Sequence, residues 1–127
     1  MQRTSLHYQS STVFENRHFH IDEGCAIELL EFMENPKMKS KIDYIIKRIL
    51  NTNFFYYDDY VKIENGISEM RIFPNGVNAR IYCREVSTIN GSHFIIAAKL
   101  LVKKKSMKIN KQINQFIDPI KDYDYDL

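Results

Sequence analysis

The chain lacks any apolar run long enough to cross a membrane, since a helical span needs about 20 consecutive apolar residues. Its opening stretch, MQRTSLHYQSSTVFENRHFH, contains no continuous apolar core of the kind that secretory signal peptides carry. We therefore expect no membrane association and a cytoplasmic location. Internal repeats and low-complexity linkers are also missing from the 127 residues, a length suited to one domain.

Cysteine is scarce and too widely spaced for a redox or metal motif. Cys25 and Cys83 form no CxxC pair, so we expect both thiols to be reduced and structural. His18 and His20 lie two positions apart on a possible strand and would project to one side. With Cys25 they form the best metal candidate, but no second ligand pair follows them. The sequence therefore predicts neither a metal nor a cofactor.

We expect a single domain over residues 1–127, with less regular ends. Residues 1–23 are polar and aromatic and form either an extension or a first strand, for which Thr12–Ile21 has the best β-forming composition. Residues 118–127 contain the acidic, aromatic run KDYDYDL. We expect this tail to fray, as exposed polar termini generally do.

Two helices separated by a short break are predicted in the first half of the chain. Gly24–Glu34 has helical spacing, and a second helix begins at Asn35 and Pro36, because Asn is a favoured N-cap and Pro fits the first helical position. The expected apolar stripes are Ile27, Leu30 and Met33 on the first helix and Met38, Ile42, Ile45, Ile46 and Ile49 on the second. Such a hairpin buries its apolar faces only against another layer.

A meander of three or four strands, followed by one more helix, is predicted in the second half. Asn-Gly and Pro-Asn-Gly turns separate the alternating apolar runs. The expected strands are Tyr60–Glu64, Ile67–Phe73, Val77–Val86 and His93–Val102, and the expected helix is Met107–Ile120 with Ser106 as its N-cap. This order predicts an α+β fold: a helical hairpin, an antiparallel β-meander and a C-terminal helix, all helices packed on one sheet face. The other face would be free for function.

Positive charge is concentrated between Arg71 and Lys111. These 41 residues hold nine Lys or Arg against a single acid, a balance of +8, whereas the other 86 residues hold nine against fifteen, a balance of −6. Cations among apolar strands resist burial, so one sheet face has to present them to water or to an anion. Clustered cations on one surface are the electrostatic signature of nucleic-acid binding.

Strand alternation places these charges on one face of the predicted sheet. The side chains expected there are Glu69, Arg71, Arg80, Tyr82, Arg84, Lys99 and Lys103. An exposed face with Arg, Tyr and Lys has the groups needed to bind and polarise a phosphodiester. The alternative is a solvated face whose arginines pair with Glu69 or Glu85.

Four segments, in this order and spacing, resemble motifs of one protein family. They are KIDYIIKRIL (41–50), YVKIENGISEMRIF (60–73), NARIYC (78–83) and KKSMKINK (104–111). They resemble the second helix, two strands and the lysine-rich motif of HigB-like toxins, which belong to the RelE/ParE superfamily of toxin-antitoxin systems. The resemblance covers about residues 25–122. It departs at Leu100 and Leu101, where the family has His or Asn followed by Gly, and at Asn110, where it has Pro.

The resemblance implies a RelE/ParE-like fold and a ribosome-dependent mRNA endoribonuclease that needs no metal. In that chemistry the ribose 2′-hydroxyl attacks the adjacent phosphate, while the protein orients the two groups and neutralises the developing charge. The implied partners are the ribosome, mRNA and a cognate antitoxin, which in many relatives is a helix-turn-helix protein.

In this interpretation Arg71 and Arg80 clamp the scissile phosphate, because a guanidinium can bind two oxygens at once. Tyr82 stacks on a base or donates a proton, and Lys104 stabilises the transition state. The residues expected to bind RNA are Arg84, Lys99, Lys103, Lys105, Lys108 and Lys111. His93 is a candidate general base, and the acidic tail could contribute a carboxylate or a tyrosine to the site, as C-terminal residues do in some relatives.

Two other functions stay open at this stage. The ParE branch of the superfamily poisons DNA gyrase by binding it, and the departures at Leu100 and Leu101 keep such a non-enzymatic toxin open. A degenerate domain that binds a partner or RNA without cleaving it is the second alternative. The paired lysines Lys104 and Lys105 and the strand with Arg80 favour the nuclease.

Overall fold

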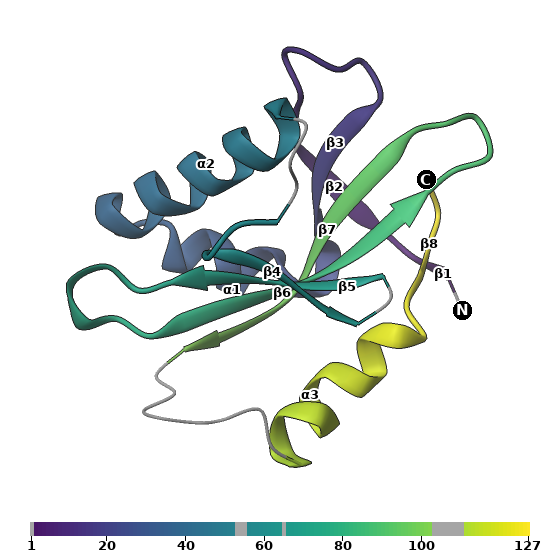
Figure 1. The fold of residues 1–127 in the computed structure, drawn as a ribbon. Coiled ribbons are helices and arrows are strands. Elements are labelled where there is room, and N and C mark those ends of the chain that lie inside the picture. Colours follow the sequence, from purple (N-terminus) through teal and green to yellow (C-terminus); the bar gives the residue numbers. More distant parts are fainter. Residues whose placement is uncertain (1, 53–55, 65, 103–110) are drawn as a thin grey trace.

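The computed structural model describes residues 2–52, 56–64, 66–102 and 111–127 (Figure 1). Within these ranges a mixed six-stranded sheet, a two-stranded sheet and three α-helices form an α+β fold, which confirms the predicted class. The helices are α1 (Glu23–Phe32), α2 (Pro36–Asn51) and α3 (Lys111–Lys121). The strands are β1 (Gln2–Arg3), β2 (Ser5–Ser10), β3 (Arg17–Asp22), β4 (Tyr60–Glu64), β5 (Ile67–Ile72), β6 (Ala79–Ser87), β7 (His93–Val102) and β8 (Asp124–Tyr125), with a 3-10 turn, η1 (Pro74–Gly76), after β5.

The large sheet has the strand order β2-β3-β7-β6-β5-β4. Strands β4 to β7 are antiparallel neighbours, so the predicted meander is confirmed. β3 lies beside β7 and runs parallel to it, which makes the sheet mixed. Parallel neighbours need a long connection, and the helical hairpin α1–α2 opens that connection directly after β3.

A hairpin, rather than the single strand predicted over Thr12–Ile21, forms the N-terminal edge of the sheet. β2 and β3 pair antiparallel across a turn. The hydroxyl of Ser11 accepts hydrogen bonds from the backbone N–H of Val13 (3.0 Å) and Phe14 (2.8 Å). These N–H groups bond to a side chain nearby and not to a neighbouring strand. The prediction of a strand was therefore wrong for residues 12–16, and β3 begins only at Arg17.

α2 forms where the sequence predicts it. The side chain of Asn35 accepts from the N–H of Lys37 at 3.0 Å, and Pro36 occupies the first helical position. The predicted stripe is buried in full: Met38, Ile42, Ile45, Ile46 and Ile49. Neither α2 nor another helix in the described ranges is long and apolar enough to cross a membrane.

α1 turns a different side to the sheet from the one predicted. Ile27 and Leu30 are 76% and 50% exposed, although their spacing suggested a buried stripe. The buried side consists of Cys25, Ala26 and Leu29, and Met33 at the C-cap is buried as predicted. The small side chains at positions 25 and 26 allow this side of the helix to lie close against β7, which leaves Ile27 and Leu30 on the outer side.

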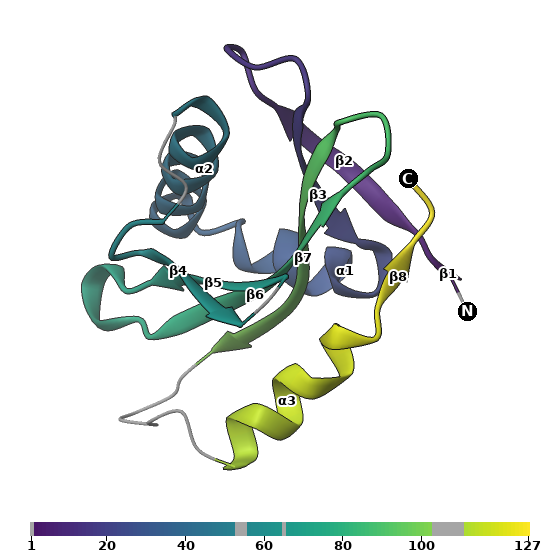
Figure 2. The ribbon, with the colours of Figure 1, turned by 45° about the vertical axis from the view of Figure 1, so that its right-hand side comes forward.

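Apolar cores lie on both faces of the sheet, so the prediction that all helices share one face was wrong. Figures 1 and 2 show α1 and α2 on one side of the sheet and α3 on the other. The larger core includes Ile45 of α2 and Ile81 of β6. On the opposite face Ile117 and Ile120 of α3 pack with Tyr82 and further apolar residues of β5 and β7. This strip is apolar and therefore needs a cover, which the amphipathic α3 supplies.

The C-terminal tail is part of the fold, contrary to the prediction that it frays. β8 pairs parallel with β1, and Tyr125 is buried. Its hydroxyl donates to Asp22 Oδ2 at 2.6 Å. Asp22 also accepts two bonds from Arg3 and caps α1 through the N–H of Gly24. The two ends of the chain are thereby joined at one buried carboxylate.

Candidate functional site

Arg71 and Arg80 meet on a single buried carboxylate. They are direct neighbours on β5 and β6, as strand alternation predicted. Glu69, which is fully buried, accepts a hydrogen bond from Arg71 Nε at 2.8 Å and one from Arg80 Nη1 at 3.0 Å on the same oxygen. We call these three residues the arginine pair cluster. Its two guanidinium groups outnumber its one carboxylate, so the cluster carries a net charge of +1.

The two arginines differ in their access to solvent. The side chain of Arg71 is 34% exposed and that of Arg80 is 16% exposed. The Arg80 guanidinium also lies 5.5 Å from the ring centre of Phe73. Arg71 is therefore more accessible to an anion from solvent. Arg80 is more buried and binds Glu69 from the interior. Their pairing with Glu69 matches the alternative drawn from the sequence, but the excess positive charge leaves capacity for an anion.

Tyr82 does not have the exposed position predicted for it. It is fully buried beneath α3, against Ile67, Ala98 and Ile117. A buried ring cannot stack on a nucleotide base, so that part of the prediction was wrong. Burial and the charge of Glu69 raise the pKa of Tyr82, so its hydroxyl keeps its proton at neutral pH.

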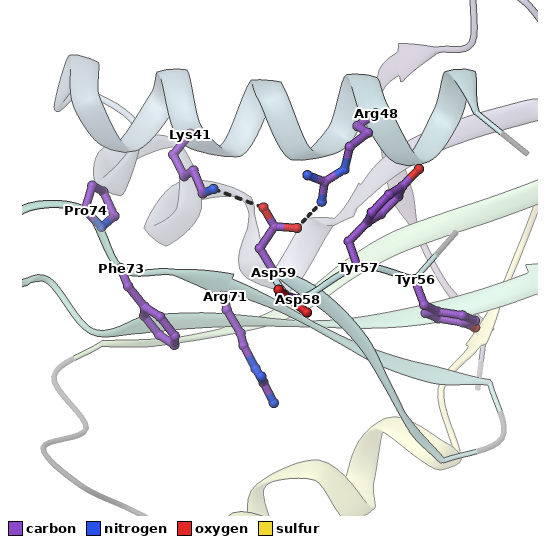
Figure 3. Close-up of a pocket in the computed structure, with 9 residues that line it drawn as sticks. All are labelled: Lys41, Arg48, Tyr56, Tyr57, Asp58, Asp59, Arg71, Phe73 and Pro74. Carbon is purple, nitrogen blue, oxygen red and sulfur yellow. Dashed lines mark hydrogen bonds and ion pairs between the residues drawn. The ribbon is translucent and has the colours of Figure 1, made fainter. Parts of the chain in front are cut away.

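A pocket of about 880 Å³ adjoins the cluster at the β4–β5 edge of the sheet (Figure 3). We call it the edge pocket. Its lining residues are Lys41, Arg48, Tyr56, Tyr57, Asp58, Asp59, Arg71, Phe73 and Pro74. Figure 3 shows side chains from α2 reaching down to Asp59, with Arg71 projecting from β5 and Phe73 from the position directly after it. The pocket is thus shared by a helix, a sheet edge and the segment between them.

Asp59 joins α2 to this edge of the sheet. Its carboxylate accepts from Lys41 Nζ at 3.0 Å and from Arg48 Nη2, and its carbonyl accepts from the N–H of Arg71 at 2.9 Å. Burial alone would raise the pKa of Asp59, but the bonds from Arg48 and Lys41 outweigh that effect and hold the pKa below its ordinary value. The carboxylate is therefore charged at neutral pH, and it keeps both cations at the pocket wall.

Aromatic side chains complete the edge pocket. The Tyr56 ring stacks nearly parallel on buried Tyr60 with ring centres 5.7 Å apart, and its hydroxyl donates to Glu85 at 2.9 Å. Burial and Glu85 raise the pKa of Tyr56 to about 12. Tyr57 lies against the Arg48 guanidinium, 3.9 Å from its ring centre. These contacts fix the aromatic walls before any ligand arrives.

The remaining predicted RNA-binding residues do not gather at the arginine pair cluster. Arg84 Nη1 donates to the Gly66 carbonyl at 3.2 Å and fills the space where a Cβ on that glycine would lie. Lys99 lines a different pocket with Arg3 and Tyr123. Lys111 is the first residue of α3. Among the predicted site residues, those outside the described ranges are Lys103, Lys104, Lys105 and Lys108, and the predicted N-cap Ser106 lies there as well.

No family model, curated protein or solved structure matches this chain.

The histidines lie away from the arginine pair cluster. His93 pairs with Ser87, at the opposite end of β6 from Arg80. His7, His18 and His20 cluster on β2 and β3 with ring centres 5.5 to 6.5 Å apart. Within the described part of the chain, no three His, Cys, Asp or Glu side chains are arranged to hold a metal ion. Both cysteines are free and buried.

Sequence reasoning named Glu69 as a possible partner of the arginines, but it missed the complete burial of Glu69 and the role of Asp59. Alternation placed Glu69 on the same face as Arg71, but its complete burial depends on α3 and on the neighbouring strand. Lys41 and Arg48 are seven residues apart on α2, a spacing that returns to the same helix side and is visible in the sequence. The position of Asp59 between them follows only from how the helix packs on the sheet edge.

Proposed function

We propose that this protein is a toxin of a type II toxin-antitoxin system and acts as a ribosome-dependent, metal-independent mRNA endoribonuclease of the HigB-like branch of the RelE/ParE superfamily. The order of a helical hairpin, an antiparallel meander and a C-terminal helix supports the proposal. The observation that carries it is the arginine pair cluster, whose net positive charge lies beside an open pocket.

In the proposed reaction the ribose 2′-hydroxyl gives its proton to a general base while its oxygen forms a bond to phosphorus, and the bond to the 5′-oxygen breaks as that oxygen takes up a proton. Arg71 binds the non-bridging oxygens and stabilises the charge that grows on them. Arg80 and Glu69 hold the Arg71 side chain in place, which lowers the cost of ordering it during the reaction. Lys104, the second proposed cation, and Lys105 belong to the lysine-rich motif and would contact the RNA backbone. A helix-turn-helix antitoxin and the ribosome are the proposed partners.

The test compares Arg71→Ala with Arg3→Ala. Arg3 is a matched control, because its Nε also donates to a buried carboxylate and its side chain is 35% exposed against 34% for Arg71. We expect Arg71→Ala to reduce cleavage of mRNA on programmed ribosomes by about 10²- to 10³-fold, the usual effect of removing one preorganised donor. Arg3→Ala should leave cleavage unchanged. The thermal midpoint is measured for both variants.

Three outcomes would redirect the proposal. Cleavage that falls only in step with the thermal midpoint would make Arg71 a structural residue. Growth arrest with intact messages and blocked replication would favour gyrase poisoning, the alternative suggested by Leu100 and Leu101. Expression without any growth defect would favour a degenerate binding domain.

A further inference from the structure

The exposed aromatic side chains are unevenly distributed. In the described part of the chain, the Phe and Tyr residues among the exposed large apolar side chains are Tyr44 (57%), Tyr56 (44%) and Phe73 (46%). Tyr56 and Phe73 line the edge pocket. Tyr44 lines a neighbouring pocket of about 480 Å³ that shares Lys41 and Pro74 with it. All three therefore border one continuous surface along α2 and the sheet edge.

Cations alternate with these rings. Lys41 and Arg48 stand on the α2 side, and Arg71, about one-third exposed, stands on β5 beside Phe73. The Lys41 ammonium and the Arg48 guanidinium also lie 5.5 Å and 5.3 Å from the Tyr44 ring centre. Rings that offer π-faces, interleaved with cations that can follow a phosphate backbone, are the composition of single-strand nucleic-acid sites.

We propose that the edge pocket and its extension to Tyr44 bind single-stranded RNA, with unpaired bases stacked on Tyr44, Tyr56 and Phe73 and phosphates on Arg71 and Lys41. The assignment deepens the proposed function, since it places the RNA that flanks the phosphate held by the arginine pair cluster. Double-stranded RNA does not fit this chemistry, because the faces of its bases are already stacked on one another.

The rigidity of Tyr56 supports this assignment. One face of its ring lies on Tyr60 and its hydroxyl is bonded to Glu85, while the side chain is still 44% exposed. A base that stacks on the open face meets a ring already in position, so little side-chain entropy is lost on binding. The edge pocket volume of about 880 Å³ is within the range of about 300–1,000 Å³ that holds small ligands, which suits a nucleotide.

The experiment measures binding separately from cleavage. A fluorescent 2′-O-methyl oligoribonucleotide, which cannot be cut through its 2′-oxygen, is titrated with the full chain at low salt and followed by anisotropy. We expect Phe73→Ala and Tyr44→Ala each to weaken binding by about five- to a hundredfold, and Phe73→Tyr to stay within about threefold of the unsubstituted protein. Ile89→Ala, which removes an exposed side chain outside both pockets, should have no effect.

An oligonucleotide of the same length without bases separates stacking from charge. It should bind more weakly to the unsubstituted protein and lose little further affinity in Phe73→Ala. No measurable binding by the unsubstituted protein, or equal affinity of all variants, would overturn the assignment even if cleavage is observed. Weaker binding by the ring variants without any cleavage would keep the site and overturn the nuclease. An equal affinity for the base-free strand would show that charge alone drives binding, and it would overturn the proposed stacking of bases.

Discussion

Asp22 and Glu69 are buried to the same degree, with side chains 1% and 0% exposed. Each accepts a hydrogen bond from the Nε of an arginine that is about one-third exposed, at 2.7 Å from Arg3 and 2.8 Å from Arg71. Each also raises the pKa of a buried tyrosine, Tyr125 or Tyr82, alongside the effect of burial. By burial and partner type alone, the two carboxylates would be judged equivalent.

They differ in charge balance and in what their partners connect. Asp22 has one guanidinium, and its other partners are the Tyr125 hydroxyl and the first turn of α1, so its cluster is neutral and joins distant segments. Glu69 has two guanidinium groups from adjacent strands, so positive charge remains beside an open pocket. A buried carboxylate with a balanced partner set indicates a structural tie, whereas surplus cations around one indicate a place for an anion.

Among changes that test the difference between Glu69 and Asp22, we expect Glu69→Gln to have the largest effect, and the effect is on cleavage. Loss of the charge removes the anchor between two guanidinium groups that otherwise repel each other, and Arg71 is then no longer held in place. We expect cleavage on programmed ribosomes to fall about 10²-fold, mainly in kcat, with partial recovery in Glu69→Asp. Equal cleavage by Glu69→Gln and the unsubstituted protein would show that the arginines need no positioning.

Asp22→Asn is the matching change in the other cluster and should affect stability only. It retains an oxygen for the α1 N-cap but loses the charged partner of Arg3 and Tyr125, which we expect to lower the free energy of unfolding by about 2 kcal/mol. Burial raises the pKa of Asp22, but the bonds from Arg3, Tyr125 and Gly24 outweigh it and hold the pKa below its ordinary value of 3.8. This carboxylate therefore stabilises the protein above pH 3.8, and that stabilisation is lost as the pH falls through its lower folded-state pKa.

Urea unfolding at several pH values checks the Asp22 prediction. The unsubstituted protein should lose stability steeply below the ordinary carboxyl range, and Asp22→Asn should show a shallower loss there. If the stability of the two proteins depends on pH in the same way, Asp22 does not have the assigned role. If Asp22→Asn cleaves RNA more slowly while its stability is unchanged, Asp22 does not differ from Glu69 in the way described.

The smallest expected effect is that of Tyr125→Phe. The ring stays and only the hydrogen bond to Asp22 is lost, so we expect the free energy of unfolding to fall by about 1.5 kcal/mol. Tyr123→Phe is the control. The Tyr123 ring contacts the Arg3 guanidinium through its face, and a phenylalanine ring keeps that contact. Urea midpoints that are the same for both variants would show that the tail adds no stability through this bond.

Local signals explain why α2 and the meander could be predicted from the sequence. Asn35 and Pro36 act within one helical turn, and the turn at Gly66 needs a positive φ, here 75°, that glycine adopts without strain. Alternation likewise placed Arg71 and Arg80 on one side. Each of these features depends on residues close together in the chain, so the sequence pattern contains the necessary information.

The errors concern contacts between segments that are far apart in the chain. The exposure of Ile27 depends on which side of α1 meets β7, and the burial of Tyr82 depends on α3 crossing the second face. An exposed and a buried tyrosine on a strand have the same sequence pattern. The edge pocket depends in the same way on the contact of Asp59 with α2. The sequence therefore predicted the two arginines of the site but not the residues that form the pocket walls.

The bond between Asp22 and Tyr125 joins residues 103 positions apart and therefore imposes an order on synthesis. A ribosome has completed α1, α2 and the meander before it adds the residue that closes this contact. The pairing of β1 with β8 must wait equally long, since a strand cannot pair with a partner that is still inside the exit tunnel. Residues 2–22 are thus made before the meander, but they reach their final contacts only after Tyr125 has left the tunnel.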